Sequence, residues 1–341
     1  MVDTALRLRA DEAVPLLHTL VARAAADLGL RVLAIKGPVA ALQGLREPRP
    51  SADLDVLVHP RDLESLVAGL VALGWRRGVE GTYASIMPPH SVNLLSDLWP
   101  VAMDVHHYFP GFLADAGAVF DALWAGHKLV TLAGVPVPAC DPVGQVAVLA
   151  LHHLRISPDG DSPALRELSS RAGTTLSADE ARALVQLAHE TDATATLRPF
   201  LLALGVPAAD IGPARNATAL DSWNRLVRAV GYEAWFMKFA RTPKRRWPRT
   251  LWHALVLTDD EIHVYSNVPP GSGGAPAAAP APNRPRPGRR AEDGSGDGPG
   301  AATGQRVGRQ RVVSSTSAGT TIVRSSSIWA ALRAFAALPR R

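Results

Sequence analysis

RPSADLDVLV, residues 49–58, places two aspartates, Asp53 and Asp55, two residues apart in an otherwise apolar run. In a β-strand, side chains two apart project from the same face, so the two carboxylates point the same way, about 7 Å apart at Cα. The alternate apolar residues then face the core. Because a buried carboxylate is costly without a partner, the pair indicates a turn flank or solvated strand end, a salt bridge or a metal site.

The overall composition favours a soluble, helix-rich protein with room for two domains. The chain has 341 residues, of which 47% are hydrophobic and few are aromatic. The single cysteine, Cys140, excludes an internal disulfide framework and a cysteine-based zinc site, which fits a reducing cytoplasm. We see no signal peptide, and charged residues or histidines interrupt the apolar stretches before about 18 residues, so no membrane span is expected.

The basic charge of the chain lies in its C-terminal tail. The net charge is +5, but the segment from Asn283 onward has 11 arginines and 3 acidic residues, which leaves −3 for the preceding 282 residues. Residues 269–327 are rich in Pro, Gly, Ala and Arg and have almost no large apolar side chains, so we expect a disordered linker. Residues 328–341 have helical apolar spacing and predict a short amphipathic helix. The basic tail is a candidate contact for an anionic partner.

Periodicity and turn residues predict an α/β domain followed by a helical domain. We expect strands near residues 31–38, 54–58, 91–95 and 101–109, and helical segments at 12–29, 39–45 and 61–75. After about residue 140 the pattern is helical, with helices expected at 141–156, 177–192, 194–205 and 219–240. The predicted domains are therefore residues 1–138 and 139–268.

A third acidic residue, Asp104, lies in the apolar run VAMDVHHYF, where His106 shares its strand face. If this strand neighbours the one that carries Asp53 and Asp55, the three carboxylates form a cluster. Such a cluster supports two-metal phosphoryl transfer, in which one ion activates the attacking hydroxyl and the other holds the triphosphate. Mg²⁺ suits carboxylates combined with substrate phosphates.

Three residues near the first aspartates are candidates for phosphate binding. Lys36 and Gly37 follow a β-type run in AIKGP, where backbone amides and a lysine charge could face a phosphate. Arg49 could bind a phosphate or pair with Asp53. The alternatives are a snorkelling lysine and, for the Asp-x-Asp pattern alone, a polar strand end.

The ordered motifs LAIKGP, RPSADLDVLV and AMDVHHYF resemble largely uncharacterised bacterial nucleotidyltransferases of the DNA polymerase β superfamily. The likeness covers residues 12 to about 130 well. It implies an α+β fold, with a small mixed sheet and flanking helices. It also implies that Asp53 and Asp55 bind metal and nucleotide, and that Asp104 is the third carboxylate and general base. His106 follows the family motif and would bind phosphate or acceptor. The superfamily's usual Gly-Ser turn is Gly37-Pro38 here, which removes a hydroxyl and an amide.

The leading hypothesis is a Mg²⁺- or Mn²⁺-dependent enzyme that moves NMP from an NTP to a hydroxyl, amine or phosphate acceptor and releases pyrophosphate. The acceptor could be a small molecule, peptide, protein or RNA, and neither it nor the base of the NTP can be predicted. One alternative is a non-catalytic nucleotide-binding or interaction module that retains the fold. The other is a glycosyltransferase with an Asp-x-Asp motif, for which the roughly 50 residues before the motif are too few.

Overall fold

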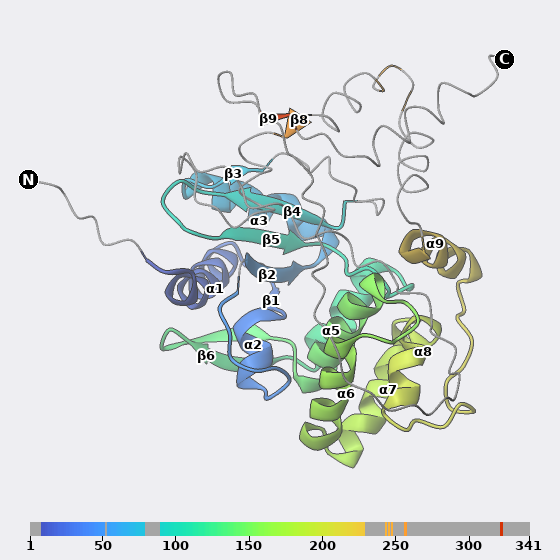
Figure 1. Ribbon diagram of the computed structural model, residues 1–341. Helices are drawn as coiled ribbons and strands as arrows, with labels where there is room; N and C mark the ends of the chain where they lie inside the picture. Colours follow the sequence, from blue (N-terminus) through green and yellow to red (C-terminus); the bar gives the residue numbers. More distant parts are fainter. Residues whose placement is uncertain are drawn as a thin grey trace, which may run out of the picture.

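The computed structural model of the chain describes residues 8–51, 53–78 and 89–228, together with residues 243, 245, 247, 256–257 and 321–322. Its main sheet has seven strands in the order β3-β4-β5-β2-β1-β7-β6 (Figure 1). These strands are β1 (Val32–Ala34), β2 (Asp53–Val58), β3 (Arg76–Arg77), β4 (Ser91–Leu95), β5 (Ala102–His106), β6 (Lys128–Leu132) and β7 (Val135–Ala139). β2 pairs parallel with β5, and β1 with β7, while the other neighbours are antiparallel. The predicted mixed sheet is confirmed.

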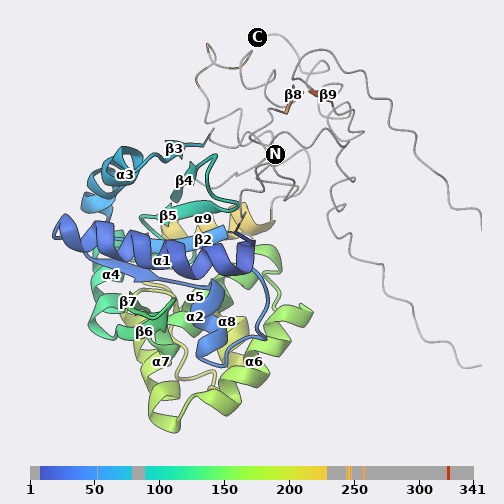
Figure 2. The same ribbon diagram turned by 90° about the vertical axis from the view of Figure 1, so that its left-hand side faces the viewer.

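One face of the sheet is covered by α1 (Ala10–Asp27) and α3 (Leu63–Ala72). Leu54, Val56 and Val58 project from β2 into the apolar cluster beneath these helices, as their period of two predicts. Figure 2 shows α1 running across this face. Asp53 and Asp55 therefore project from the opposite face of β2.

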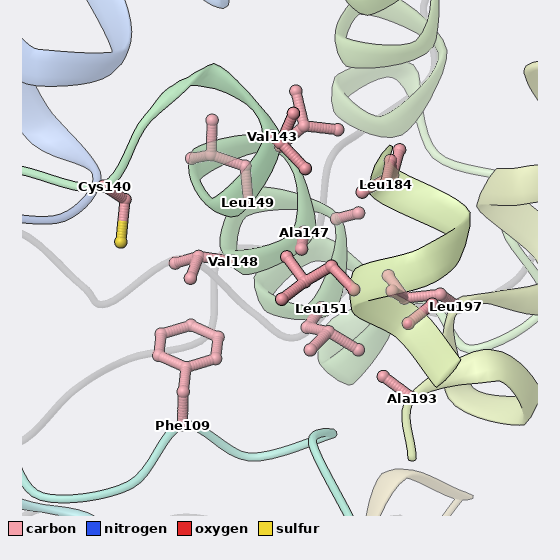
Figure 3. Packing of buried hydrophobic residues seen from close by; sticks show 14 of the residues in the cluster. Phe109, Cys140, Val143, Ala147, Val148, Leu149, Leu151, Leu184, Ala193 and Leu197 are labelled. Atoms are coloured by element: carbon pink, nitrogen blue, oxygen red, sulfur yellow. The ribbon is translucent and has the colours of Figure 1, made fainter. Parts of the chain in front are cut away.

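The opposite face of the sheet meets a helical region built around α5. Its helices are α4 (Ala116–Ala125), α5 (Pro142–Ile156), α6 (Pro163–Thr175), α7 (Ala178–Glu190), α8 (Thr194–Ala203) and α9 (Ala217–Arg228). Asp141 caps α5 by accepting from the Gly144 N–H at 2.8 Å, and Pro142 occupies the first turn. Figure 3 shows the middle of α5 packed against α7 and α8, which explains its nearly continuous apolar sequence.

A single apolar cluster joins the sheet to this helical region. It includes Leu33 of β1, Ile35 directly after β1, Leu57 of β2, and buried side chains of α5, α7 and α8. The predicted domain boundary at 138/139 stays a prediction, and the packing places one continuous core across it. The shared core fixes α5 against the face of the sheet that carries the aspartates.

The sequence predictions agree with most of the described elements. The structure confirms the predicted strands at β2, β4 and β5, and the predicted helices at α1, α3, α5, α7 and α8. The expected helical turns at 39–45 correspond to the short α2 (Gly37–Leu42), and η1 (Pro60–Asp62) precedes α3. Helices α4 and α6 and the β6–β7 hairpin were not predicted. Two prolines, Pro136 and Pro138, weaken the strand pattern of β7, because proline cannot donate to a ladder.

Several predictions lie partly or wholly outside the described residues. The expected helix at 219–240 is described as far as Arg228, as α9. The expected linker at 269–327 is described only at β9 (Thr321–Ile322), which pairs with β8 (Val256–Leu257), and the expected helix at 328–341 is outside. None of the helices in the described ranges has the length and apolar character needed to cross a membrane.

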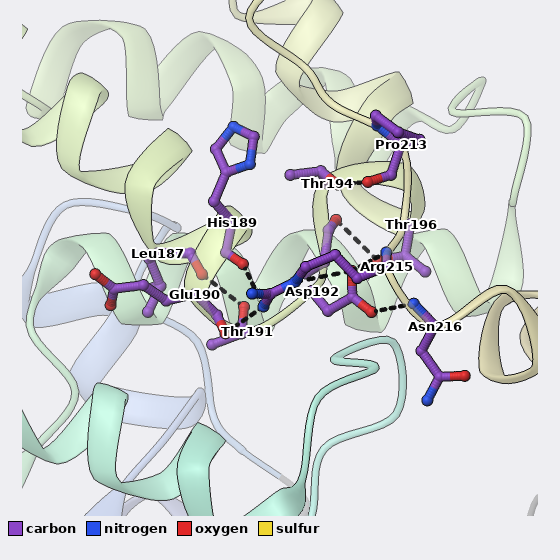
Figure 4. A network of polar contacts seen from close by, with 11 residues as sticks. Leu187, His189, Glu190, Thr191, Asp192, Thr194, Thr196, Pro213, Arg215 and Asn216 are labelled. Carbon is purple, nitrogen blue, oxygen red and sulfur yellow. Dashed lines mark hydrogen bonds and ion pairs between the residues drawn. The ribbon is translucent and has the colours of Figure 1, made fainter.

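A polar network fastens the turn between α7 and α8 to the segment before α9 (Figure 4). Asp192 adopts a positive φ of 54°, and its two carboxylate oxygens accept from the backbone N–H groups of Arg215 at 2.6 Å and Asn216 at 2.8 Å. The Arg215 guanidinium donates to the carbonyls of His189 and Glu190 at the end of α7. These bonds satisfy backbone groups at a helix end and hold a long connection in place.

His18 is a buried histidine in α1, and neither of its ring nitrogens has a hydrogen-bond partner among the described residues. Burial lowers the pKa of His18 to about 3. Between that value and the ordinary 6.5, the unfolded chain binds a proton that the folded chain does not, so stability falls as pH falls below 6.5.

We expect His18→Leu to stabilise the fold by about 1 kcal/mol near pH 7.5, because it removes unsatisfied polar atoms from the core. Between pH 7.5 and 5.5, the wild type should lose about 1.4 kcal/mol more unfolding free energy than the variant. Urea unfolding at the two pH values measures both effects. Equal losses in the two proteins would show that His18 is not the buried neutral group described.

Candidate active site

The parallel register of β2 and β5 brings the predicted acidic residues together. Asp55 lies directly beside Asp104, and Asp53 lies beside Ala102 at the start of β2. On the other side of β5, Asn93 of β4 is the partner of Asp104, and its Nδ2 donates to Asp104 Oδ1 at 2.9 Å. A row of polar side chains therefore crosses three adjacent strands on the face that meets the helical region.

Asp55 is the most enclosed of the three carboxylates, with 5% of the residue exposed. Its Oδ1 lies 2.5 Å from Lys36 Nζ and 2.9 Å from His106 Nε2. A buried carboxylate needs a cation and hydrogen-bond donors to offset its lost hydration. These two contacts explain how Asp55 is tolerated in a buried strand. Its partners are His106 of β5 and Lys36, which follows β1.

Lys36 has an unusual backbone conformation, with φ 55° and ψ −144°. Its N–H donates to Gln145 Oε1 of α5 at 2.8 Å, and Gly37 follows with a φ of 43°. Such conformations cost about 1–3 kcal/mol and are found at functional sites that the surrounding structure holds rigid. The turn places Lys36 Nζ against Asp55. The predicted contact of Lys36 with a phosphate stays a prediction.

His106 lies within the site as a neutral ring. Burial lowers its pKa to about 3, and the nearby Lys36 charge acts in the same direction. Its Nε2–H therefore donates to Asp55, while Nδ1 is buried with no hydrogen-bond partner in the described part of the chain. In this position His106 orients Asp55. Its predicted contact with phosphate or acceptor stays a prediction.

Asp55, Asp104 and His106 form a group that could hold a metal ion, since one ligand atom from each lies within 4.8 Å of the others. Burial raises the pKa of Asp104, and it also raises the pKa of Asp53, to which the charge of Asp55 adds. Asp104 has no ion pair with a described residue. A divalent cation would offset this uncompensated charge, and carboxylate oxygens are the donors that Mg²⁺ and Mn²⁺ prefer. The donor set therefore fits a divalent metal.

The predicted metal set differs from this group in one residue. Asp53 is outside the group and more exposed than Asp55, although it shares the same face of β2. The assignment of Asp53, Asp55 and Asp104 as metal ligands stays a prediction.

The remaining predicted residues lie around the start of α2 and the loop before β2. Gly37 is buried, and a Cβ there would lie 3.4 Å from Ser51 Oγ. Arg49 is exposed, and within the described ranges it makes no ion pair with Asp53. Arg46 Nη2 donates to the Arg49 carbonyl at 3.0 Å and to Ser51 Oγ at 3.3 Å. The loop thus supplies a hydroxyl beside Gly37, near the turn in which Pro38 replaces the usual serine.

Sequence reasoning missed three residues that border the site. Asn93 holds Asp104, Gln145 holds the backbone of Lys36, and Arg155 donates from Nη1 to His90 Nε2 at 3.1 Å. Asn93 is the central residue of a predicted strand, and Gln145 is a polar residue inside an apolar helix, so both carried a usable signal. Arg155 ends an apolar helix and looks like an ordinary C-terminal charge in the sequence alone.

The family model described as "Uncharacterised nucleotidyltransferase" matches residues 9–198, which is more than half of the chain. The chain belongs to this nucleotidyltransferase family. The match runs from α1 into α8, so it includes the acidic strands and the helix that carries Gln145. Family membership confirms the resemblance to uncharacterised nucleotidyltransferases stated from the sequence. No curated protein matches the chain significantly.

Solved structures with some likeness to this nucleotidyltransferase have low sequence identity. The antibiotic-resistance factor ANT(2'')-Ia is 19% identical, with 52% of this chain and 90% of that chain covered and a TM-score of 0.38. An antigenic nucleotidyltransferase-like protein from Paracoccidioides brasiliensis is 17% identical, with 57% and 94% covered and a TM-score of 0.33. A putative nucleotidyltransferase from H. pylori is 14% identical, with 69% and 100% covered and a TM-score of 0.29.

Proposed function

We propose that this protein transfers NMP from an NTP to an acceptor hydroxyl, amine or phosphate and releases pyrophosphate. The observation that carries the proposal is the parallel register that sets Asp55 beside Asp104, with Asp53 on the same face of β2. Family membership supports the reaction class. The reaction forms a bond from the acceptor to the α-phosphorus and breaks the bond between that phosphorus and the β-phosphate oxygen.

The residues of the chain have distinct roles in this reaction. Asp53, Asp55 and Asp104 would hold the divalent ions, and His106 and Asn93 fix Asp55 and Asp104, respectively, by hydrogen bonds. We assign to Asp104 the role of accepting the acceptor's proton, as the family resemblance implies, and burial raises the pKa of this carboxyl. Lys36, Gly37 and Arg49 line the phosphate side as the sequence predicts.

Bound at these carboxylates, Mg²⁺ or Mn²⁺ in a two-ion arrangement would neutralise the triphosphate and lower the pKa of the attacking group. We also propose a cytoplasmic location, as the single cysteine indicates, and Cys140 is buried and unpaired. The basic tail remains our candidate for contact with an anionic partner.

Incubation with each labelled NTP, Mg²⁺ or Mn²⁺ and a panel of acceptors tests the proposal. The panel should contain hydroxyl- and amine-bearing small molecules, peptides, proteins, RNA and a cell extract. We expect pyrophosphate and a labelled acceptor. In a parallel incubation with a nucleotide sugar in place of the NTP, release of UDP or GDP would instead indicate a glycosyltransferase. Absence of product with both the NTP and the nucleotide sugar would indicate a non-catalytic module.

A further inference from the structure

One face of α5 lines the acidic site along its length. Gln145, near the start of the helix, binds the backbone of Lys36, and Arg155, in the last turn, binds His90. His152 lies between them and is neutral, because burial lowers its pKa to about 2, with the Lys36 charge acting in the same direction. Residues seven and three apart on a helix lie on the same side. Of these three residues, Arg155 alone carries a permanent positive charge, and it lies near the end of β5.

Arg155 is connected to Asp55 through two histidines, His90 and His106, and not by a direct ion pair. Arg155 Nη1 lies 3.1 Å from His90 Nε2, the rings of His90 and His106 are 5.4 Å apart between centroids, and His106 Nε2 lies 2.9 Å from Asp55 Oδ1. Across the described ranges, Arg155 has no carboxylate within ion-pair distance. Burial lowers its pKa, while Asp55 and Asp104 are near enough to oppose that shift.

A half-buried guanidinium that lies near two carboxylates without pairing with either is suited to an anion that binds beside those carboxylates. Divalent ions held by these carboxylates would make that part of the site positive as well, so phosphate oxygens could contact both the ions and Arg155. Arginine is well matched to this task, because its planar fork donates two parallel hydrogen bonds to a phosphate. Lys36 is less available, because its ammonium is already paired with Asp55.

We propose that Arg155 binds the polyphosphate of the nucleotide donor from the α5 side, opposite the carboxylates of β2 and β5. This inference rests on the proposed function and adds a residue of the helical region to the donor site. Binding of the donor would then require residues of the sheet and of the helical region, which share one apolar core. The helical region would help to select a triphosphate over a monophosphate.

Calorimetry with Mg²⁺ and inorganic tripolyphosphate, ATP or AMP tests this role. We expect Arg155→Gln to weaken binding of tripolyphosphate and ATP by about 10- to 100-fold, since hydrogen bonds to charged groups are lost. AMP affinity should change less than about threefold, and Arg155→Lys should recover part of the loss by restoring the charge without the fork. Arg198→Gln is the control, because this arginine of α8 donates to the Ile211 carbonyl and has no ion pair with another residue that the structure describes. Thermal unfolding verifies that each variant is folded.

The outcomes separate this inference from the proposed function. Wild-type affinities in Arg155→Gln, with binding lost in Asp55→Asn, would overturn the role of Arg155 and leave the proposed function standing. A loss in Arg46→Gln but not in Arg155→Gln would place the polyphosphate on the Asp53 side and would also overturn it. A wild-type protein that binds neither tripolyphosphate nor any of the four NTPs would contradict both.

Discussion

Asp55→Asn is expected to lower Mg²⁺-dependent nucleotidyl transfer by about 10³-fold or more, because it removes the negative charge of a proposed metal ligand from the centre of the site. Asparagine keeps the shape of the side chain, so the packing of β2 should survive. The change also removes the ion pair with Lys36 and weakens the hydrogen bond from His106. Steady-state release of pyrophosphate measures the effect once a donor and acceptor are known.

Asp97→Asn is a matched control for this variant. Asp97 lies in the exposed turn after β4, and its side chain is 84% exposed, with a 3.7 Å contact to Arg76. The control should retain wild-type turnover. Turnover within about tenfold of wild type in a folded Asp55→Asn protein would contradict a metal-holding role for Asp55.

Gly111→Ala is expected to destabilise the fold by about 2–4 kcal/mol. Gly111 has a φ of 107°, which side chains rarely adopt, and it follows β5 in the loop that leads to the helical region. A Cβ there would lie 2.6 Å from Leu151 Cδ2 and 3.2 Å from Leu151 Cγ, and Leu151 is fully buried in α5. Figure 3 shows Leu151 on the side of α5 that meets Leu184 of α7 and Leu197 of α8, so a shift of its side chain would disturb this packing.

Gly134→Ala separates the two causes of this destabilisation. Gly134 has a φ of 79° in the β6–β7 turn, and a Cβ there would meet nothing within 4 Å. This variant should lose only the backbone part, about 1 kcal/mol. Chemical denaturation of both variants gives the comparison. Equal losses would show that the core around Leu151 yields to the added methyl group.

The sequence was informative wherever a local pattern determines the structure. Alternating apolar residues placed β2 and β5, and the Ser177–Glu180 capping box marks the start of α7 where a helix was predicted. The same alternation put Asp53 and Asp55 on one strand face. These features depend on neighbours in the chain, so one sequence was enough to predict them.

The rest of the site depends on contacts between distant segments. The pairing of Lys36 with Asp55 requires β1 and β2 to lie side by side, and the proximity of Arg155 to Asp104 requires α5 to pack across the sheet. No local pattern encodes either contact. The separation of Asp53 from the Asp55–Asp104–His106 group likewise follows from the register of β5, which the sequence did not specify.

The most direct test of the central claim is calorimetric titration of the wild type, Asp53→Ala and Asp55→Ala with each of the four NTPs, in Mg²⁺ and in EDTA. We predict that the wild type binds at least one NTP only with the metal present, and that both variants lose this binding while remaining folded. Unchanged binding in both variants, or equal binding by the wild type in EDTA, would contradict a metal-dependent nucleotide site at these aspartates.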